Sequence, residues 1–354
     1  SFVGFEGATL SAVSSSKCGA VIHEMTHAFG LPHDFRHDSN FNGDLMGNGL
    51  RGLRGVFNPG RYASNYCRIS MGCGMTLNTS RYFNGSTAGG SYSTSVNLST
   101  SGAATPVQGT LQLLFTASDN DGLALAWLQR NGDLVGEMAL SGTKVSGTFS
   151  TPYFTPGTAD QYTVTVYDVY GNRASSARTV TPATGTTRAP QPYITMTPAV
   201  ALPGEAVRYD ASSSTDPDGN TSTMKVEWDF DGDGVYDTAP STVQWIIGTA
   251  TTPGTQFVSV RTTDATSAVA VSSAVAFHVH KPSLGIALSA GNVPGLSWDT
   301  KCGFTYQLQD SADLTAWSPL TLANAAGDGT DFSYLAPAPI TGARFFKVSA
   351  QKSN

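Results

Sequence analysis

Histidine is concentrated in one short stretch near the start of the chain. Four of the six histidines lie between positions 23 and 37. On a helix, the spacing of His23 and His27 projects both imidazoles from the same face, which suits the binding of a Zn²⁺ ion. Gly30 predicts a sharp turn that brings His33 back as a third nitrogen ligand. Three protein ligands leave the fourth corner of a tetrahedral zinc site open, as a catalytic site requires.

Glu24 adjoins the first histidine and supplies a carboxylate beside the predicted metal. A zinc ion lowers the pKa of a bound water to about 7 and polarises a carbonyl oxygen. From its position Glu24 can take the proton of that water and later pass a proton to a leaving amine. The sequence therefore predicts hydrolysis of a peptide bond through a zinc-activated water, with Glu24 as the general base.

A helix must hold these side chains, and the sequence around them predicts one. Ser14, Ser15 and Ser16 are candidate N-caps, since a serine hydroxyl can accept a hydrogen bond from a free N–H of the first turn. The apolar spacing of a helix follows in Val21, Ile22, Met25, Ala28 and Phe29. We expect the helix to end at Gly30, because glycine adopts the left-handed conformation and Pro32 prevents the helix from resuming.

The stretch resembles the metzincin clan of zinc peptidases, whose pattern is H-E-x-x-H-x-x-G-x-x-H followed by a methionine turn. Every fixed position is matched, by His23, Glu24, His27, Gly30 and His33. The resemblance implies a zinc endopeptidase domain of α+β fold, which we assign to residues 1–90.

The resemblance also implies a methionine that packs beneath the metal without coordinating it. Met46, in the segment from Asp44 to Asn48, fits this position best, and Met71 and Met75 are the alternatives.

Two further residues of this segment have open roles. Asp34 either supports a ligand imidazole or caps the turn. His37 could take the place of His33 as the third ligand, although the spacing from Gly30 favours His33.

Metzincin domains place a twisted sheet ahead of the active-site helix, and here 22 residues precede His23. We therefore expect the chain to be the C-terminal part of a longer precursor, in which the upstream sheet is missing, or one product of a cleavage. In the second case the chain would associate with the cleaved N-terminal fragment.

The rest of the sequence predicts β-structure. Charged residues make up only 13% of the chain, and 38 glycines and 18 prolines accompany many short apolar or alternating runs, which suits short strands joined by polar turns. The fold class we expect is multidomain: an α+β metzincin-like catalytic remnant followed by three all-β sandwich modules. Their predicted ranges are 91–183 for an immunoglobulin-like module, 190–281 for a module that resembles the polycystic-kidney-disease (PKD) type, and 283–354 for a small C-terminal module.

The PKD-like module contains a run of aspartates. Asp229, Asp231, Asp233 and Asp237 surround Gly234 at a spacing similar to that of a Ca²⁺ loop, where oxygen ligands converge on a hard cation. The alternative is an Asp/Gly turn without an ion. Calcium is favoured, because carboxylates crowded this closely repel one another without a cation.

The immunoglobulin-like module has two similar runs. Asp119 to Gly122 and Tyr167 to Asn172 are turn markers, and plain turns are favoured there over a second calcium site.

Charge and hydropathy exclude some functions. The net charge is −6 and the seven lysines do not cluster, so a nucleic-acid partner is not expected. No apolar run approaches the roughly 18 residues of a membrane span. The four cysteines allow one or two disulfide bridges.

Taken together, these features predict a secreted, extracellular and bacterial zinc endopeptidase that hydrolyses proteins or peptides. The β modules would dock it to extracellular matrix or polysaccharide. The alternative is a non-catalytic adhesin or carbohydrate- or matrix-binding protein with a vestigial metal site.

Overall fold

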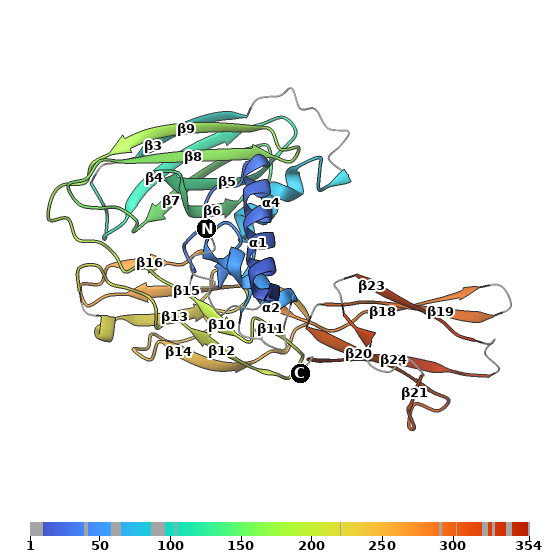
Figure 1. Cartoon of the computed structure of the whole chain (residues 1–354). Helices are drawn as coiled ribbons and strands as arrows, with labels where there is room; N and C mark the ends of the chain where they lie inside the picture. Colours follow the sequence, from blue (N-terminus) through green and yellow to red (C-terminus); the bar gives the residue numbers. More distant parts are fainter. Residues whose placement is uncertain are drawn as a thin grey trace.

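A helical N-terminal region precedes a long series of β-strands (Figure 1). The computed structural model describes residues 10–38, 42–57, 65–85, 96–102, 105–219, 221–289, 292–301, 303–320, 325–327, 330–337 and 342–352. Strands far outnumber helices within these ranges, so the expectation of a mostly β protein is confirmed. None of the helices in the described ranges combines the length and the apolar character that crossing a bilayer demands.

The N-terminal region, residues 10–85, is built around one long helix. Its elements are α1 (Leu10–Ala28), β1 (Gly43–Asp44), η1 (Asn48–Gly52), α2 (Leu53–Phe57), β2 (Cys67–Arg68) and α4 (Met71–Thr79). The predicted start of the helix at Ser14–Ser16 was wrong, because α1 begins at Leu10 and these serines lie inside it. Leu10 and Ala12 favour helix, and neither glycine nor proline separates them from the serines.

The N-terminal region contains little sheet. Its strands, within the part that the structure describes, are the two-residue β1 and β2, which pair in parallel. The twisted sheet of an α+β peptidase is therefore not part of the described structure. Cys18, Cys67 and Cys73 form no disulfide bridge, and Cys302 lies outside the described residues.

The first sandwich consists of two antiparallel sheets. Its strands are β3 (Asn97–Gly102), β4 (Leu111–Ser118), β5 (Leu123–Arg130), β6 (Asp133–Ala139), β7 (Lys144–Thr151), β8 (Asp160–Asp168) and β9 (Arg173–Val180). One sheet has the order β3-β4-β7 and the other β6-β5-β8-β9. On β4, alternate residues such as Leu113 and Phe115 point into the shared core, which is the burial pattern of a strand with one solvated face.

The N-terminal region packs on the outer face of the four-stranded sheet. Leu31, Met46 and Cys73 form one buried cluster with side chains of β5, β6 and β8. Strand β5 is therefore covered on both faces, which accounts for its nearly unbroken apolar sequence from Leu123 to Leu128. The edge strand β6 lies along the same contact, so the N-terminal region and the first sandwich share a core.

The second sandwich follows, with Trp228 and Phe277 in its core. Its elements are β10 (Thr195–Thr197), β11 (Val200–Ala201), β12 (Ala206–Asp210), η3 (Thr221–Thr223), β13 (Lys225–Asp229), β14 (Trp245–Thr249), β15 (Gly254–Thr263), β16 (Val269–Val271) and β17 (Val275–Val279). One sheet has the order β10-β12-β14, and the other has the order β11-β17-β15-β13 with β16 paired to β15.

The third module lies at the end of the chain (Figure 1). Its strands are β18 (Leu284–Ser289), β19 (Val293–Asp299), β20 (Phe304–Ser311), β21 (Ser318–Pro319), β22 (Ala325–Ala326), β23 (Asp331–Leu335) and β24 (Phe345–Lys352). The ring of His280 bonds the hydroxyl of Tyr306 at 2.7 Å across the seam between the second sandwich and this module. Val200 and Leu202 of the second sandwich also pack on the core of the third module.

Candidate metal centre

The end of α1 and the turn after it bring three histidines together. His23 and His27 lie one turn apart near the C-terminus of α1. The N–H of Gly30 then donates a hydrogen bond to the carbonyl of His27, and the N–H of Leu31 donates one to the carbonyl of Thr26. This pair of hydrogen bonds is that of a Schellman motif. Gly30 has a φ of 88°, which only glycine adopts without strain. The reversed chain carries His33 back to the helix.

The Nε2 atoms of the three imidazoles converge. The Nε2 of His27 is 3.2 Å from that of His23 and 3.2 Å from that of His33. In a tetrahedral site with Zn–N bonds of about 2.0–2.1 Å, two nitrogen ligands are about 3.3 Å apart. The spacing of the histidine centre, which we define as His23, His27 and His33, therefore fits a zinc ion.

The opposite nitrogen of each ring faces an oxygen acceptor. The Nδ1 of His23 is 2.7 Å from the carbonyl oxygen of Leu45, and the Nδ1 of His27 is 2.8 Å from that of Leu31. The Nδ1 of His33 is 3.8 Å from the carboxylate of Asp133. Because a carbonyl can only accept, the first two rings carry their proton on Nδ1 and turn the Nε2 lone pair toward the centre.

Electrostatics favour the uncharged, ligating form of the third histidine. Burial lowers the pKa of His33, and electrostatic interaction with the neighbouring imidazoles of His27 and His23 lowers it further, while Asp133 and Glu24 act in the opposite direction. A neutral imidazole is the form that binds a metal.

Met46 lies directly against the histidine-bearing helix. Its side chain is completely buried, and its sulfur accepts a hydrogen bond from the hydroxyl of Thr26 at 2.7 Å. The same hydroxyl bonds the carbonyl of His23. Met46 thus contacts α1 at Thr26, which lies between the first two histidines in the chain, whereas Met71 and Met75 belong to α4. Support of the ligands by Met46 stays a prediction.

Asp34 fixes the turn after His33 through an arginine and makes none of its described hydrogen bonds to an imidazole. Both of its carboxylate oxygens accept from the guanidinium of Arg36, at 2.9 and 2.7 Å. Arg36 also pairs with Glu137 of β6 at 3.2 Å. Burial would raise the pKa of Asp34, but the charge and hydrogen bonds of Arg36 outweigh it and lower the pKa to about 2.

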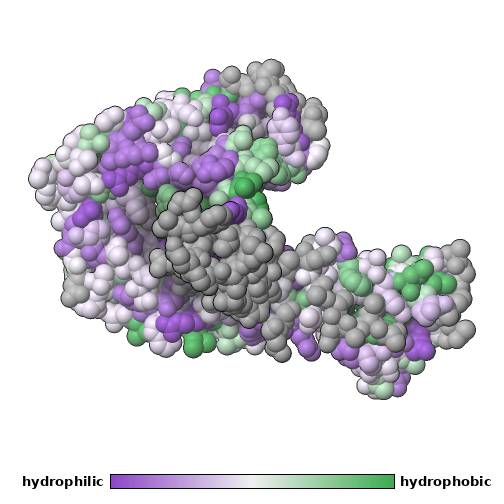
Figure 2. Space-filling view, in the orientation of Figure 1, coloured by the Kyte–Doolittle hydropathy of each residue, from purple (hydrophilic) through white to green (hydrophobic). Residues whose placement is uncertain are grey.

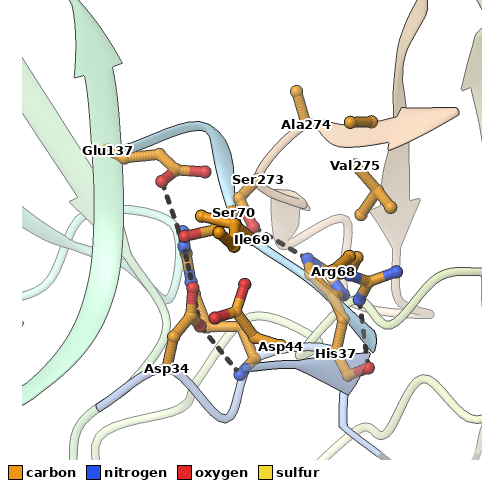
Figure 3. Close-up of a pocket in the computed structure, with 12 residues that line it drawn as sticks. Asp34, His37, Asp44, Arg68, Ile69, Ser70, Glu137, Ser273, Ala274 and Val275 are labelled. Carbon is orange, nitrogen blue, oxygen red and sulfur yellow. Dashed lines mark hydrogen bonds and ion pairs between the residues drawn. The ribbon is translucent and has the colours of Figure 1, made fainter. Parts of the chain in front are cut away.

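These charged side chains line a small cavity between the N-terminal region and the two sandwiches. Figure 3 shows Asp34, Asp44, Arg68 and Glu137 around it. Its volume is about 10 Å³, room for about one water. The cavity is therefore too small for a substrate, and its polar lining lies where the N-terminal region contacts the two sandwiches.

The predicted general base is exposed. Glu24 lies on α1, next to His23 in the chain. The apolar residues Val21, Ile22 and Met25 of the same helix are exposed too, and Figure 2 shows apolar surface beside α1 and α4. His27 and His33 are only half-buried, so the centre is partly open to solvent.

His37 does not join the histidine centre. It is 8% exposed and lies between the N-terminal region and the second sandwich. Its Nε2 is 2.8 Å from the hydroxyl of Ser273, and its Nδ1 accepts from the N–H of Ile194 at 3.4 Å. The alternative in which His37 replaces His33 as a ligand is therefore not the arrangement in the structure.

The aspartate run of the second sandwich converges only in part. Asp229, Asp231 and Asp237 each offer an oxygen within 4.8 Å of the others, and we name them the second-sandwich cluster. Asp233 does not belong to this cluster, because its carboxylate turns away to accept the N–H of Val235 at 2.7 Å. Calcium binding by all four aspartates stays a prediction.

The sequence did not predict the contacts of two acidic residues of β6 with the N-terminal region. Asp133 faces His33, and the N–H of Leu134 bonds the carbonyl of His33 at 2.8 Å. Glu137 accepts from Arg36 and from the N–H of Gly72 in α4 at 2.7 Å. No local signal marks either residue, because their partners lie in the N-terminal region, far earlier in the chain.

Comparison with known proteins gives no family. No family model and no curated protein matches the chain. Several solved structures match. Fibronectin(III)-like modules of CbhA from Clostridium thermocellum share 14% identity over 52% of this chain and 94% of theirs, with a TM-score of 0.23. Carbohydrate-binding modules of the β-sandwich superfamily share 16% identity over 46% of this chain and 96% of theirs, with a TM-score of 0.25.

A third match is the chain of the FN1–FN3 domains of chicken CNTN1. It shares 11% identity over 73% of this chain and 92% of its own, with a TM-score of 0.21. These structures are built of fibronectin III-like or other β-sandwich modules, as are the modules described above. At TM-scores of this size, they carry no argument about what the chain does.

Proposed function

We propose that the chain is a zinc-dependent endopeptidase whose catalytic centre is His23, His27 and His33. One observation carries this proposal. Three Nε2 atoms converge at zinc-ligand spacing while the Nδ1 atoms of His23 and His27 are committed to carbonyl acceptors. Lone pairs pointed at one another in this way repel unless a cation lies between them.

Two features favour a catalytic over a structural zinc site. Structural sites are closed by four protein ligands, whereas the described residues bring three metal-ligating side chains to this centre. The centre is also partly open, since His27 and His33 are half-buried and Glu24 is exposed. An open corner beside a carboxylate is the arrangement that hydrolysis requires.

The roles of the chain's own residues follow from this arrangement. Bound zinc would supply Lewis acidity and lower the pKa of a water. Glu24 would accept a proton at its carboxylate and pass it to the leaving amine of the peptide. Leu45 and Leu31 would hold the first two imidazoles in the ligating tautomer through their carbonyls. Proteins and peptides outside the cell are the proposed substrates.

Replacement of the general base tests the proposal. Glu24→Gln keeps the size of the side chain but removes its basicity, so we expect zinc content to stay at one per chain and casein hydrolysis to fall by about 10²–10⁴-fold. Ala20→Gln is the matched control, because it puts the same amide at an exposed position one turn earlier on α1. Elemental analysis and hydrolysis rates are measured on zinc-loaded protein. Equal hydrolysis by Glu24→Gln and the wild type would exclude this mechanism.

A second candidate is a non-catalytic protein that binds polysaccharide or extracellular matrix. The observation that favours it is the predominance of β modules in the described chain. This candidate predicts stoichiometric zinc, no turnover on a peptide library, and binding to a polysaccharide that the His27→Ala variant retains.

A further inference from the structure

Two turns meet at one end of the first sandwich. The first connects β4 to β5 and contains Asp119 and Asp121, and the second follows Asp168 at the end of β8. The N–H of Val169 bonds the carbonyl of Gly122 at 2.9 Å and joins the two turns. One oxygen from each of the three aspartates, which we name the first-sandwich cluster, lies within 4.8 Å of the others.

Asp168 is rigidly held in this cluster. It is completely buried, and its Oδ1 accepts the N–H groups of Tyr170 and Asn172 at 2.9 and 2.7 Å. Its Oδ2 accepts from the side-chain amide of Asn172 at 2.6 Å. These donors fix the orientation of the carboxylate, so its remaining lone pairs have a defined direction before any ligand arrives.

Asp119 has one carboxylate oxygen without a donor among the described residues. Its side chain is 6% exposed, and its Oδ1 accepts the N–H of Asp121 at 2.9 Å. Its Oδ2 is buried and has no hydrogen-bond partner among the described residues. Neither Asp119 nor Asp168 forms an ion pair with an arginine or lysine of the described chain. A buried carboxylate oxygen without a donor or a positive charge is costly, and a bound cation removes that cost.

We propose that Asp119, Asp121 and Asp168 form a Ca²⁺ site that joins the two turns. Calcium takes oxygen ligands at about 2.3–2.6 Å, so oxygens on opposite sides of one ion are about 4.8 Å apart. The mutual limit of 4.8 Å within the cluster lets a single ion reach all three carboxylates. Zinc does not suit the site, because it prefers nitrogen and sulfur ligands such as those of the histidine centre.

The site differs from the second-sandwich cluster in what its oxygens already bind. There, Asp229 accepts the N–H groups of Gly232 and Gly234 with its two oxygens, and Asp237 accepts the N–H of Phe230. Those carboxylates bond N–H groups of their own turn, and Asp168 does the same. The first-sandwich cluster differs in that the buried Oδ2 of Asp119 has no donor among the described residues, and in that its three carboxylates come from two turns that are distant in sequence.

Calcium titration of the full zinc-loaded chain tests the site. We expect isothermal titration with CaCl₂ to show binding at about 0.1–1 mM, the range typical of extracellular modules. Asp119→Asn, which keeps the shape and the Oδ1 acceptor, should weaken binding at least about tenfold, and so should the less buried Asp121→Asn. Asp231→Asn is the matched control in the second-sandwich cluster and should leave this binding unchanged.

Thermal unfolding separates a cation site from a plain turn. Without calcium, Asp119→Asn should melt at or above the wild-type temperature, because the substitution removes an unpaired buried charge. With 10 mM CaCl₂ the wild type should gain stability and Asp119→Asn should not. The proposal is overturned if the wild type binds no calcium up to this concentration, if Asp119→Asn responds like the wild type, or if MgCl₂ gives the same response.

Discussion

The histidine centre and the second-sandwich cluster are both built from one short segment, and both bring metal-ligating atoms close together. They differ in where the partners of those atoms lie. In the histidine centre, Leu45 and Asp133 hold rings from outside the segment, and the Nε2 atoms are left facing one another. In the second-sandwich cluster, the carboxylates accept N–H groups of the same turn, as Asp229 does from Gly232 and Gly234.

This difference distinguishes a group of residues that merely could bind a metal from an arrangement that favours metal binding. Ligand atoms that already have donors gain little from an ion, since binding must first replace those hydrogen bonds. Ligand atoms that converge without donors are unfavourable until a cation arrives. By this criterion the histidine centre calls for an ion, whereas the aspartate run that looks like a calcium loop in sequence is largely satisfied as a turn.

Loss of one histidine should have the largest effect. His27→Ala removes the ring that is 3.2 Å from both of its neighbours. The roughly 10–16 kcal/mol of a four-ligand zinc site corresponds to about 2.5–4 kcal/mol per ligand, so we expect zinc affinity to fall about 10²–10³-fold. Competition with a chromogenic chelator measures it. His37→Ala, a buried histidine outside the centre, is the control, and an equal loss there would contradict the assignment of ligands.

A buried aspartate of the N-terminal region, Asp44, provides a second test of this comparison, because it should make the stability of the chain depend on pH. The Oδ2 of Asp44 is buried without a partner in the described structure, unlike either oxygen of Asp229. Burial and the charge of Asp34 raise the pKa of Asp44 to about 8. The folded chain therefore holds a proton here that the unfolded chain releases above about pH 4, so this stabilising contribution declines as the pH rises from about 4 to about 8.

Asp44→Asn removes this dependence and keeps an acceptor for the N–H of Met46. We expect the free energy of unfolding of the variant, relative to the wild type, to rise by about 1.4 kcal/mol per pH unit, or about 3 kcal/mol from pH 5 to pH 7. Urea unfolding at pH 5, 6 and 7 measures the difference. A constant difference across these pH values would show that Asp44 is ionised in the folded chain.

The parts of the molecule that depend on local sequence were predictable. The apolar runs at Leu111–Phe115, Ala124–Leu128 and Tyr162–Tyr167 lie in β4, β5 and β8. They could be recognised because each strand shows its pattern of apolar residues within its own sequence. The end of α1 just before Gly30 and the return of His33 follow from one glycine and the spacing around it. The convergence of the three imidazoles needs little beyond these local features.

Contacts between modules were not predictable. His37 meets Ser273, and Arg36 meets Glu137, only because the sandwiches dock on the N-terminal region. The first-sandwich cluster was interpreted as plain turns, since nothing in the local sequence shows that Asp119 and Asp168 end side by side. The exposure of Val21 and Met25 was not evident either, because periodicity shows that a helix has an apolar face but not what covers it.

The second-sandwich cluster should respond to mutation as a turn. Asp229 is 3% exposed and accepts a backbone N–H with each carboxylate oxygen. Asp229→Asn leaves one of these donors facing an amide N–H₂, so we expect a loss of about 1–3 kcal/mol in the free energy of unfolding, with or without calcium. The exposed Asp231→Asn should change it by less than about 0.5 kcal/mol. If calcium instead stabilised the wild type but not Asp229→Asn, this cluster would be an ion site.

Substitution of Asp133, which faces a ring of the histidine centre from another element, should have the smallest effect on zinc affinity. The Nδ1 of His33 and the carboxylate of Asp133 are 3.8 Å apart, and the side chains are 45% and 52% exposed. A partner that firmly orients a ligand histidine contributes about 10–100-fold to metal affinity, and a distant, solvated one contributes less. Asp133→Asn should therefore lower zinc affinity by less than about tenfold, and Asp331→Asn in the third module should leave it unchanged. A loss as large as that of His27→Ala would mean that β6 supplies a ligand, and that the centre depends on the first sandwich as much as on its own helix.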